Sequence, residues 1–499
     1  MTYEVHHMID GKIVEGKSGR FGDIYNPSVG EVAGKVALAS KSEVEEAIAV
    51  AEAAFPEWSA TSVVTRSRII ARFKELLYEH MDELAELVSK EHGKVFSDAK
   101  GSVQRGIEVV EFACGIPHAL KGEFSDNVAS GIDVYSMRKP LGVCAGISPF
   151  NFPAMIPLWM APMAIACGNT FVMKPSEKDP SCPMRIAELF KEAGLPDGVL
   201  NVVNGDKEAV DTLLTDPRVK AVSFVGSTPI AQYVYATATA HGKRCQAMGG
   251  AKNHMIVMPD ADLDLVSDAL VGAAYGSAGE RCMAISVAVA VGNVGDELAK
   301  MLKPRVEALK IGPSMDPASE MGPLVTREHL NKVKGYVDLA VEEGAELLVD
   351  GRAFKDYKQG YENGFFMGGC LIDKVTPDMK SYKDEIFGPT LQIIRADDFE
   401  SAAALPTKHE YGNGTSIFTQ NGRAAREYAD KVEVGMVGIN VPIPVPVSFY
   451  TFGGWKNSAF GDHNTMGMAA VNFYTRTKTV TSRWPTVATG AEFDIPTLK

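Results

Sequence analysis

One cysteine, Cys282, has neighbours that can turn it into a nucleophile. It lies in the segment 276–286, GSAGERCMAIS, between small residues that let a ligand approach the backbone closely and an apolar predicted strand at 287–291. Arg281 stands directly beside it, and a fixed cation lowers the pKa of a thiol and so produces a thiolate at neutral pH. The alternative is a buried structural cysteine that follows a helix. The other motifs of the chain favour the nucleophile.

Two motifs that follow predicted strands carry polar side chains. In SPFNFP, residues 148–153, Asn151 stands between two aromatic rings. An amide held at a strand end can donate to a developing oxyanion, and the alternative is a turn residue. In KPSE, residues 174–177, Lys174 and Glu177 would lie at the carboxyl edge of a parallel sheet. There they could bridge ribose hydroxyls and Glu177 would repel a 2′-phosphate, while the alternative is a solvated turn.

Three further motifs contain glycine. FVGST, residues 224–228, runs from a strand into a helix with Gly226 at the junction, so free N–H groups there can face a pyrophosphate, although the motif is not GxGxxG. The pair GG at 249–250 lets two elements approach closely. DEIFGP, residues 384–389, places the carboxylate of Glu385 and the ring of Phe387 before a turn. Each of these motifs is weak evidence when taken singly.

Length, charge and cysteine usage restrict the class of protein. At 499 residues the chain is too long for one core, which predicts two or three domains. A formal net charge of −13 argues against a nucleic-acid surface and against an anionic membrane partner. Seven scattered cysteines without a CxxC pair indicate free thiols in a reducing compartment, with neither a disulfide framework nor a metal site. The N-terminus resembles neither a signal nor a transit peptide, so we expect a cytoplasmic protein.

Apolar strands alternate with short helices over two long parts of the chain. Ser42 and Glu45 predict a capping box at the start of a helix that reaches about residue 58. Strands at 142–147, 170–174, 199–203, 221–225 and 244–248, with helices between them, predict a parallel, doubly wound sheet. A second set over about 253–440, with helices at 264–276, 297–309, 326–343 and 423–431, predicts a second α/β domain. The Pro-alternating residues 441–446 predict an extended crossing.

Taken together, the motifs SPFNFP, KPSE, FVGST, GG, ERC and EIFGP occur in an order that resembles the aldehyde dehydrogenase superfamily. The resemblance runs from residues 26–27 to 477–479 and implies an α/β fold of the aldehyde dehydrogenase type. It implies a Rossmann-type NAD-binding domain over 1–120 and 140–249 and a catalytic domain over 250–440. A β-arm for oligomerisation would comprise 121–139 and 470–499, with 441–469 as a return segment. The arm implies a homotetramer.

The resemblance also implies roles for single residues. Cys282 would be the nucleophile and Asn151 the oxyanion donor. The residues implied at the NAD cofactor are Phe150, Lys174, Ser176, Glu177, Gly226, Ser227, Glu385 and Phe387.

One departure from the family pattern points to acyl transfer. Hydrolytic members have a Glu before Leu-Gly-Gly, and here Ala247 stands at that place. Without this base, water attack on a thioester should slow by roughly 10²–10⁴-fold, whereas the thiol of coenzyme A is a better nucleophile than water. The segments GGAKNH, ERCM and VPIP resemble the CoA-acylating methylmalonate- and malonate-semialdehyde dehydrogenases, in which an arginine pair holds the substrate carboxylate. Arg281 and Arg105 match that pair, although a surface helix is the alternative for Arg105.

This branch implies NAD-dependent oxidative decarboxylation of the semialdehyde with acyl transfer to CoA, giving propionyl-CoA or acetyl-CoA. A non-acylating dehydrogenase that releases a free acid, an NAD-free thioesterase and a structural protein that kept the fold remain as alternatives.

Overall fold

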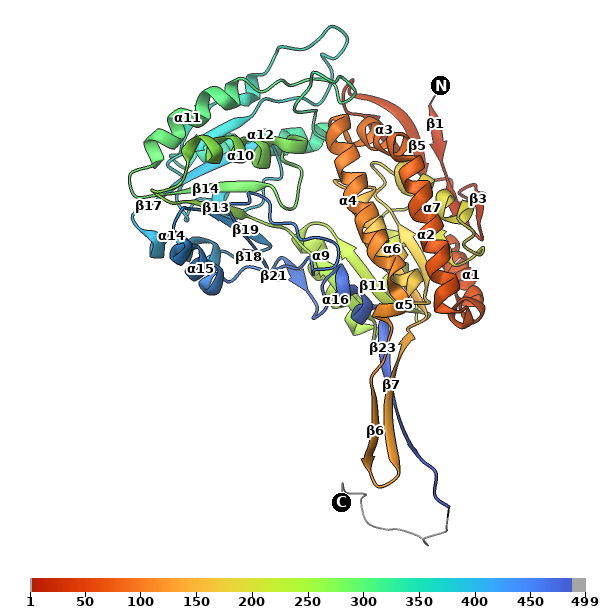
Figure 1. Ribbon diagram of the computed structural model, residues 1–499. Helices are drawn as coiled ribbons and strands as arrows, with labels where there is room; N and C mark the ends of the chain where they lie inside the picture. Colours follow the sequence, from red (N-terminus) through yellow and green to blue (C-terminus); the bar gives the residue numbers. More distant parts are fainter. Residues whose placement is uncertain (1, 487–499) are drawn as a thin grey trace.

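The computed structural model describes residues 2–486. Two α/β lobes lie side by side, and a long three-stranded arm projects from one of them (Figure 1). A small sheet formed by β1 (Tyr3–Val5), β5 (Glu31–Ala37) and β4 (Phe21–Asn26) lies near the N-terminus. No helix between residues 2 and 486 is long and apolar enough to cross a membrane.

The first lobe is built on an eight-stranded sheet. In spatial order its strands are β22 (Ala459–Phe460), β12 (Arg244–Met248), β11 (Val219–Val225), β8 (Val143–Ile147), β9 (Thr170–Lys174), β10 (Leu200–Val202), β2 (His7–Ile9) and β3 (Lys12–Val14). The five strands from β12 to β10 are parallel, and the other three pair antiparallel. The five strands predicted between residues 142 and 248 are therefore confirmed, and so is the doubly wound, parallel arrangement.

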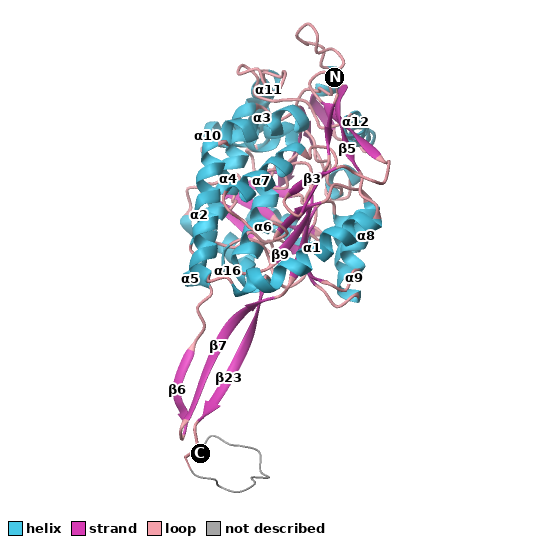
Figure 2. Ribbon diagram, turned by 90° about the vertical axis from the view of Figure 1, so that its right-hand side faces the viewer, coloured by secondary structure: helices cyan, strands magenta, loops and turns pink. Residues whose placement is uncertain are grey.

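Helices cover both faces of this sheet. One core packs α1 (Lys41–Ala60), α8 (Lys207–Thr215) and α9 (Thr228–Ala240) against the strands. The other core packs α2 (Val63–Glu79), α4 (Phe96–Cys114), α6 (Met155–Ala166) and α7 (Ser181–Glu192) against the opposite face (Figure 2). All twelve residues of α6 are buried, because this helix lies between the sheet and the helices α2 and α4. A helix that is apolar on every side is expected in such a middle layer.

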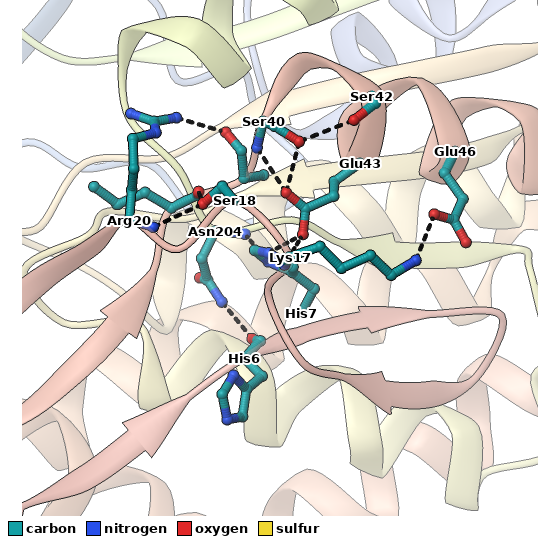
Figure 3. Close-up of polar contacts among 12 residues, drawn as sticks. His6, His7, Lys17, Ser18, Arg20, Ser40, Ser42, Glu43, Glu46 and Asn204 are labelled. Carbon is teal, nitrogen blue, oxygen red and sulfur yellow. Dashed lines mark hydrogen bonds and ion pairs between the residues drawn. The ribbon is translucent and has the colours of Figure 1, made fainter.

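The capping box of α1 lies two residues before the predicted one. Ser40, and not Ser42, is the N-cap, and its backbone N–H donates to Glu43 Oε2 at 2.8 Å (Figure 3). Ser40 with Glu43 and Ser42 with Glu45 both fit the sequence pattern of a capping box, and tertiary contacts select the pair Ser40 and Glu43. Glu43 is buried, and its Oε1 also accepts from the backbone N–H of Lys17 at 2.6 Å. Figure 3 shows that the surrounding polar contacts tie the N-terminal strands to α1.

The second lobe is built on a seven-stranded sheet. In spatial order its strands are β15 (Glu346–Val349), β16 (Cys370–Asp373), β17 (Thr390–Ala396), β14 (Ile285–Val291), β13 (Asn253–Val257), β19 (Gly414–Phe418) and β20 (Met436–Ile439). All neighbours are parallel except β15 and β16. The predicted helices correspond to α10 (Leu263–Tyr275), α11 (Gly295–Glu307), α12 (Arg327–Glu342) and α15 (Gly422–Lys431). The second α/β set is thus confirmed, with helix ends shifted by at most two residues.

The chain returns from the second lobe to the first after residue 440. Through β22 it adds an antiparallel strand to β12, at the edge of the first sheet. After α16 (Gly467–Phe473) it enters the arm, which consists of β6 (Phe124–Ala129), β7 (Ile132–Pro140) and β23 (Thr475–Arg483). β23 pairs with β7 over the full length of both strands. Residues 487–499, the end of the predicted arm segment 470–499, lie outside the described residues.

Candidate active site

The predicted motifs meet at one edge of the first sheet. The chain passes from β8 to β9 and β10 on one side and then crosses back to β11 on the other side of β8. In open α/β sheets, the carboxyl ends of strands at such a switch point form a ligand crevice. Asn151 follows β8, Lys174 ends β9, and Gly226 follows β11. The sheet therefore brings together three motifs that are far apart in sequence.

Lys174 and Glu177 form an ion pair at the end of β9. Lys174 Nζ lies 3.1 Å from Glu177 Oε2, and the Lys174 side chain is buried. Burial opposes ionisation of Glu177, but the charge and hydrogen bond of Lys174, the backbone N–H of Glu177 itself and the charge of Lys178 together hold the pKa of this carboxyl below its ordinary value. Ser176, also buried, accepts the backbone N–H of Lys178 at 3.1 Å. Glu177 is therefore favoured in its ionised form at the position where the sequence predicts a contact with ribose.

Gly226 and Ser227 form the junction between β11 and α9. Ser227 is the N-cap of this thirteen-residue helix, whose first N–H groups have no partner inside the helix. The backbone N–H of Gly226 donates to the Met248 carbonyl at 3.1 Å, and a Cβ at residue 226 would lie 2.5 Å from the ring of Phe224. A helix N-terminus at the crevice is suited to a phosphate group.

Cys282 belongs to the second lobe and is held by its backbone. Its carbonyl accepts two side-chain amides, Asn253 Nδ2 at 2.9 Å and Asn413 Nδ2 at 3.1 Å. Just before it, Ser277 and Ala278 adopt left-handed φ values of 55° and 51°. Such conformations cost about 1–3 kcal/mol each for residues other than glycine and are concentrated at functional sites. The turn that presents Cys282 is therefore strained and fixed in place.

The side chain of Cys282 borders a cavity of about 540 Å³. Its apolar wall comes from both lobes and from the return segment, and it consists of Phe152, Met155, Trp159, Met283, Ile443, Val445 and Phe452. Arg105, on α4, and Arg281 line the same cavity. The structure thus brings both predicted arginines to the cavity that Cys282 lines, and Arg105 is only partly exposed there.

Both arginines have carboxylate partners within the protein. Arg281 Nη2 donates to Asp98 Oδ1 at 2.7 Å. Arg105 Nη1 donates to Glu108 Oε2 at 2.5 Å, and its Nη2 donates to the Pro446 carbonyl at 2.6 Å. The two guanidinium groups are therefore oriented before any ligand arrives.

The expectation that Arg281 lowers the thiol pKa is wrong. Burial, followed by the neighbouring Glu385 carboxyl, raises the pKa of Cys282 to about 12. The side chain that opposes this rise is the Lys94 ammonium, and not Arg281. The physical reason is that burial penalises the thiolate, and the Glu385 carboxyl that approaches it in the fold adds to this effect. The thiol must therefore lose its proton in the course of the reaction.

Lys94 and Asn151 are joined by a contact that the sequence did not predict. Lys94 lies between α3 (Met81–His92) and α4, and its Nζ donates to the backbone carbonyl of Asn151 at 2.7 Å. The ammonium also lies 4.1 Å from the ring centroid of Phe152. Asn151 itself is buried. No local sequence pattern marks Lys94, which comes just after α3 and before α4.

Glu385 and Phe387 approach the same site from the second lobe. Glu385 Oε1 accepts the backbone N–H of Ala251 at 2.8 Å, and burial raises the pKa of this carboxyl to about 7. Glu385, Phe387 and Cys282 line one small cavity. The ring of Phe387 lies 6.0 Å from that of Phe150, edge to face. The structure therefore brings together the rings of Phe150 and Phe387, two of the residues that the resemblance implies at the cofactor.

A buried cluster behind the site was also missed. Glu280 is fully buried, with His329 Nε2 at 3.6 Å from its Oε1 and His92 Nε2 at 3.8 Å from its Oε2. Burial raises the pKa of Glu280 to about 8 and lowers the pKa of both imidazoles. His329 Nε2 also contacts the Phe387 carbonyl at 2.6 Å. Within residues 2–486, no three His, Cys, Asp or Glu side chains are grouped to hold a metal ion.

Ala247 lies inside the first sheet, next to the last residue of β12. It is fully buried and pairs with Phe224 of β11 and Phe460 of β22. Its methyl group supplies neither an acid nor a base. Three residues later, Gly250 lies close to the carboxyl of Glu385.

The fold and this geometry define an oxidoreductase in which a second α/β lobe presents a cysteine to a dinucleotide crevice. The profile of the aldehyde dehydrogenase family matches residues 13–480, and the chain belongs to this family.

Named relatives align over nearly the whole chain. The malonate-semialdehyde dehydrogenase of Pseudomonas aeruginosa is 57% identical over 497 residues, which cover 99% of each chain. The mitochondrial methylmalonate-semialdehyde dehydrogenase (acylating) of Arabidopsis thaliana is 46% identical over 497 residues, covering 100% of this chain and 81% of that one. A Sinorhizobium meliloti protein crystallised in complex with NAD has a TM-score of 0.96 and 59% identity, covering 98% of this chain and 99% of that chain.

Proposed function

We propose that the protein is an NAD-dependent, CoA-acylating dehydrogenase of methylmalonate semialdehyde and malonate semialdehyde, which it converts to propionyl-CoA and acetyl-CoA. The observation that carries this proposal is the cavity in which Cys282 lies together with the guanidinium groups of Arg105 and Arg281. A guanidinium binds a carboxylate through two charge-assisted hydrogen bonds, so the cavity suits an aldehyde that carries an acid group. The names of the relatives agree with this substrate class.

The first half of the reaction forms a thioester on Cys282. The Cys282 thiol first gives its proton to solvent. Its sulfur then bonds to the aldehyde carbon, and the C=O electron pair moves to oxygen, where the Asn151 amide and the Cys282 N–H would donate. When bound, NAD⁺ would supply the hydride acceptor for this carbon, whose C=O bond re-forms as the hydride leaves. The apolar wall of the cavity excludes water, which strengthens each of these electrostatic contacts.

The second half releases CO₂ and transfers the acyl group. The carboxylate held by the arginines leaves as CO₂, its electron pair is delocalised into the thioester carbonyl as an enolate, and a solvent proton completes the α-carbon. The CoA thiolate then attacks the carbonyl, and the Cys282 thiolate leaves. Ala247 gives no base for water, so thiolysis should outrun hydrolysis.

The residues at the crevice fit a dinucleotide. Lys174, Ser176 and Glu177 would hold the adenine ribose, and the ionised Glu177 favours NAD⁺ over NADP⁺. Gly226 and Ser227 at the start of α9 would face the pyrophosphate. Glu385 would lie at the other end of the dinucleotide. A Cβ on residue 250 would come within 2.5 Å of Glu385 Oε2, so the glycine at this position leaves room for the carboxyl. Glu385 would bind the nicotinamide ribose, with Phe150 and Phe387 near the ring.

The decisive experiment follows the product formed from malonate semialdehyde and NAD⁺, with and without CoA. Without CoA we expect a burst of NADH that approaches one per active site, followed by slow turnover. With CoA, steady turnover should be faster by roughly 10²-fold or more, and acetyl-CoA should accumulate. Equal rates with and without CoA, with release of a free acid, would favour the non-acylating alternative.

We also propose that the lobes are functional domains with the boundaries given above, that the arm joins subunits into a homotetramer, and that the enzyme is cytoplasmic. All seven cysteines lie within residues 2–486 and are free, which suits a reducing compartment.

A further inference from the structure

Lys94 is a buried ammonium close to the nucleophile. Its exposed fraction is 1%, so its stem and its charge are both removed from solvent. Among residues 2–486, no carboxylate oxygen lies within 4.0 Å of its Nζ, in contrast to Arg281, whose guanidinium is paired with Asp98. Its close contacts are the Asn151 carbonyl at 2.7 Å and the Phe152 ring at 4.1 Å.

Such a group is costly to bury. An ammonium without a carboxylate partner loses several kcal/mol of hydration, and one carbonyl and one ring recover only part of it. Burial accordingly lowers the pKa of Lys94 to about 8, while the more distant Asp98 opposes that shift. A methionine or leucine would fill the same space at a lower cost. The contacts of the charged group therefore need an explanation other than stability.

The two contacts lie on either side of one peptide group. The Asn151 carbonyl belongs to the peptide group that links these residues, and the Phe152 side chain leaves from the next Cα, so a group that holds both restricts the rotation of this peptide. This peptide is bonded directly to the Cα of Asn151, so a contact that holds the peptide limits how far this Cα and the side chain it carries can shift. Phe152 also lines the cavity that contains Cys282. The ammonium thus acts at the point where the strand end of the first lobe faces the nucleophile of the second.

We propose that Lys94 is the positioning residue for Asn151, which it fixes through the backbone so that the side-chain amide faces the oxyanion formed at Cys282. This inference rests on the role proposed above for Asn151. Lys94 itself touches neither substrate nor cofactor in this arrangement. A displacement of a donor by about 1 Å can reduce a rate by about 10²-fold. The loss of an oxyanion donor costs about 10²–10³-fold.

A double-mutant cycle tests the proposal, because residues that act as one unit give non-additive losses. The variants are Lys94→Met, Asn151→Ala and the double variant. The measured quantity is the rate constant of the NADH burst with saturating NAD⁺ and malonate semialdehyde. We expect a loss of about 10²-fold for Lys94→Met and about 10²–10³-fold for Asn151→Ala. The double variant should be within about threefold of Asn151→Ala alone, since no amide remains to be positioned.

Two further variants serve as controls. Lys90, four residues earlier, has a side chain that is 56% exposed and pairs with Glu86, so Lys90→Met should leave the burst unchanged. Lys94→Gln replaces Lys94→Met in the cycle if the apolar variant does not fold, as judged by NAD⁺ binding and thermal unfolding.

The possible results distinguish the positioning role of Lys94 from the oxyanion role of Asn151. Losses that multiply in the double variant, or a Lys94 variant with a normal burst, overturn the positioning role and leave the function of Asn151 intact. An Asn151→Ala enzyme with a normal burst overturns the oxyanion assignment itself. A Lys94→Met enzyme that is only less stable to heat, with an unchanged burst, shows a purely structural lysine.

Discussion

At the scale of single residues, the cavity combines a nucleophile with two guanidinium groups that already have partners. We expect Arg105→Leu to lower kcat/KM for malonate semialdehyde by about 10- to 100-fold. This is the low end of the cost of losing a charged partner, because Arg105 is partly exposed. For propanal, which has no carboxylate, kcat/KM should change by less than about threefold. Steady-state kinetics with the two aldehydes test this, and parallel losses would make Arg105 a structural residue.

A second residue-scale prediction concerns Ala247. Ala247→Glu should raise CoA-independent turnover if the new carboxylate reaches the thioester, because a general base contributes about 10²–10⁴-fold to water attack. Ala247→Gln has nearly the same shape and no base, so it should show no gain. The release of free acid after the NADH burst, measured without CoA, distinguishes the two variants. A gain shared by both variants would mean that opened packing, and not a base, admits water.

A third prediction concerns the pH dependence of stability near Glu280. Burial raises the folded-state pKa of this carboxyl to about 8, well above its unfolded value. The stabilisation it contributes is therefore fully present below pH about 4.5 and is lost as the pH rises through about 8. Glu280→Gln keeps the shape and removes the titration. Calorimetry should show a higher Tm than wild type at pH 9 and a small difference at pH 5, whereas an equal shift at both pH values would assign the effect to packing.

At the scale of elements, strand ends were predictable and buried charges were not. The parallel series between residues 142 and 248 follows from local apolar runs that are separated by helices, and motifs at strand ends meet because parallel strands end at one edge. The capping box was misplaced because Ser40 and Ser42 carry the same pattern, and only the burial of Glu43 selects the first. The thiol pKa was misjudged because the burial of Cys282 and its approach to Glu385 are set by the tertiary structure and not by its sequence neighbours. Lys94 was missed because no local pattern marks a lysine that will be buried.

One element-scale contact should control cofactor binding. Phe387 has a left-handed φ of 59°, and His329 on α12 contacts its carbonyl at 2.6 Å. His329→Ala removes this hydrogen bond, which is worth about 1 kcal/mol, so we expect the Kd for NAD⁺ to rise by about fivefold. His329→Gln can still donate to the carbonyl and should restore binding. Calorimetric titration with NAD⁺ measures both variants, and an unchanged affinity for His329→Ala would show that the loop holds its own conformation.

At the scale of the whole molecule, the arm projects away from the two lobes (Figure 1), and its strand β6 exposes apolar side chains. Phe124 on β6 is 65% exposed, and it stands on an edge strand of a three-stranded sheet. Burying one such side chain contributes about 1.5–3 kcal/mol, and it would do so in every subunit of a symmetric assembly. Exposed edges and apolar patches of this kind mark surfaces for other chains.

We therefore expect Phe124→Asp to shift the assembly towards smaller species, as measured by light scattering after size exclusion at micromolar concentration. Ser125→Asp is the matched control, because adjacent residues of a strand point to opposite faces and the added charge is the same. The control should keep the wild-type mass. The NADH burst per Cys282 should persist in both variants, since none of the residues of this chain that line the cavity belongs to the arm. If both variants keep the wild-type mass, Phe124 does not support the assembly, and if both dissociate, the added charge and not the lost apolar contact is responsible.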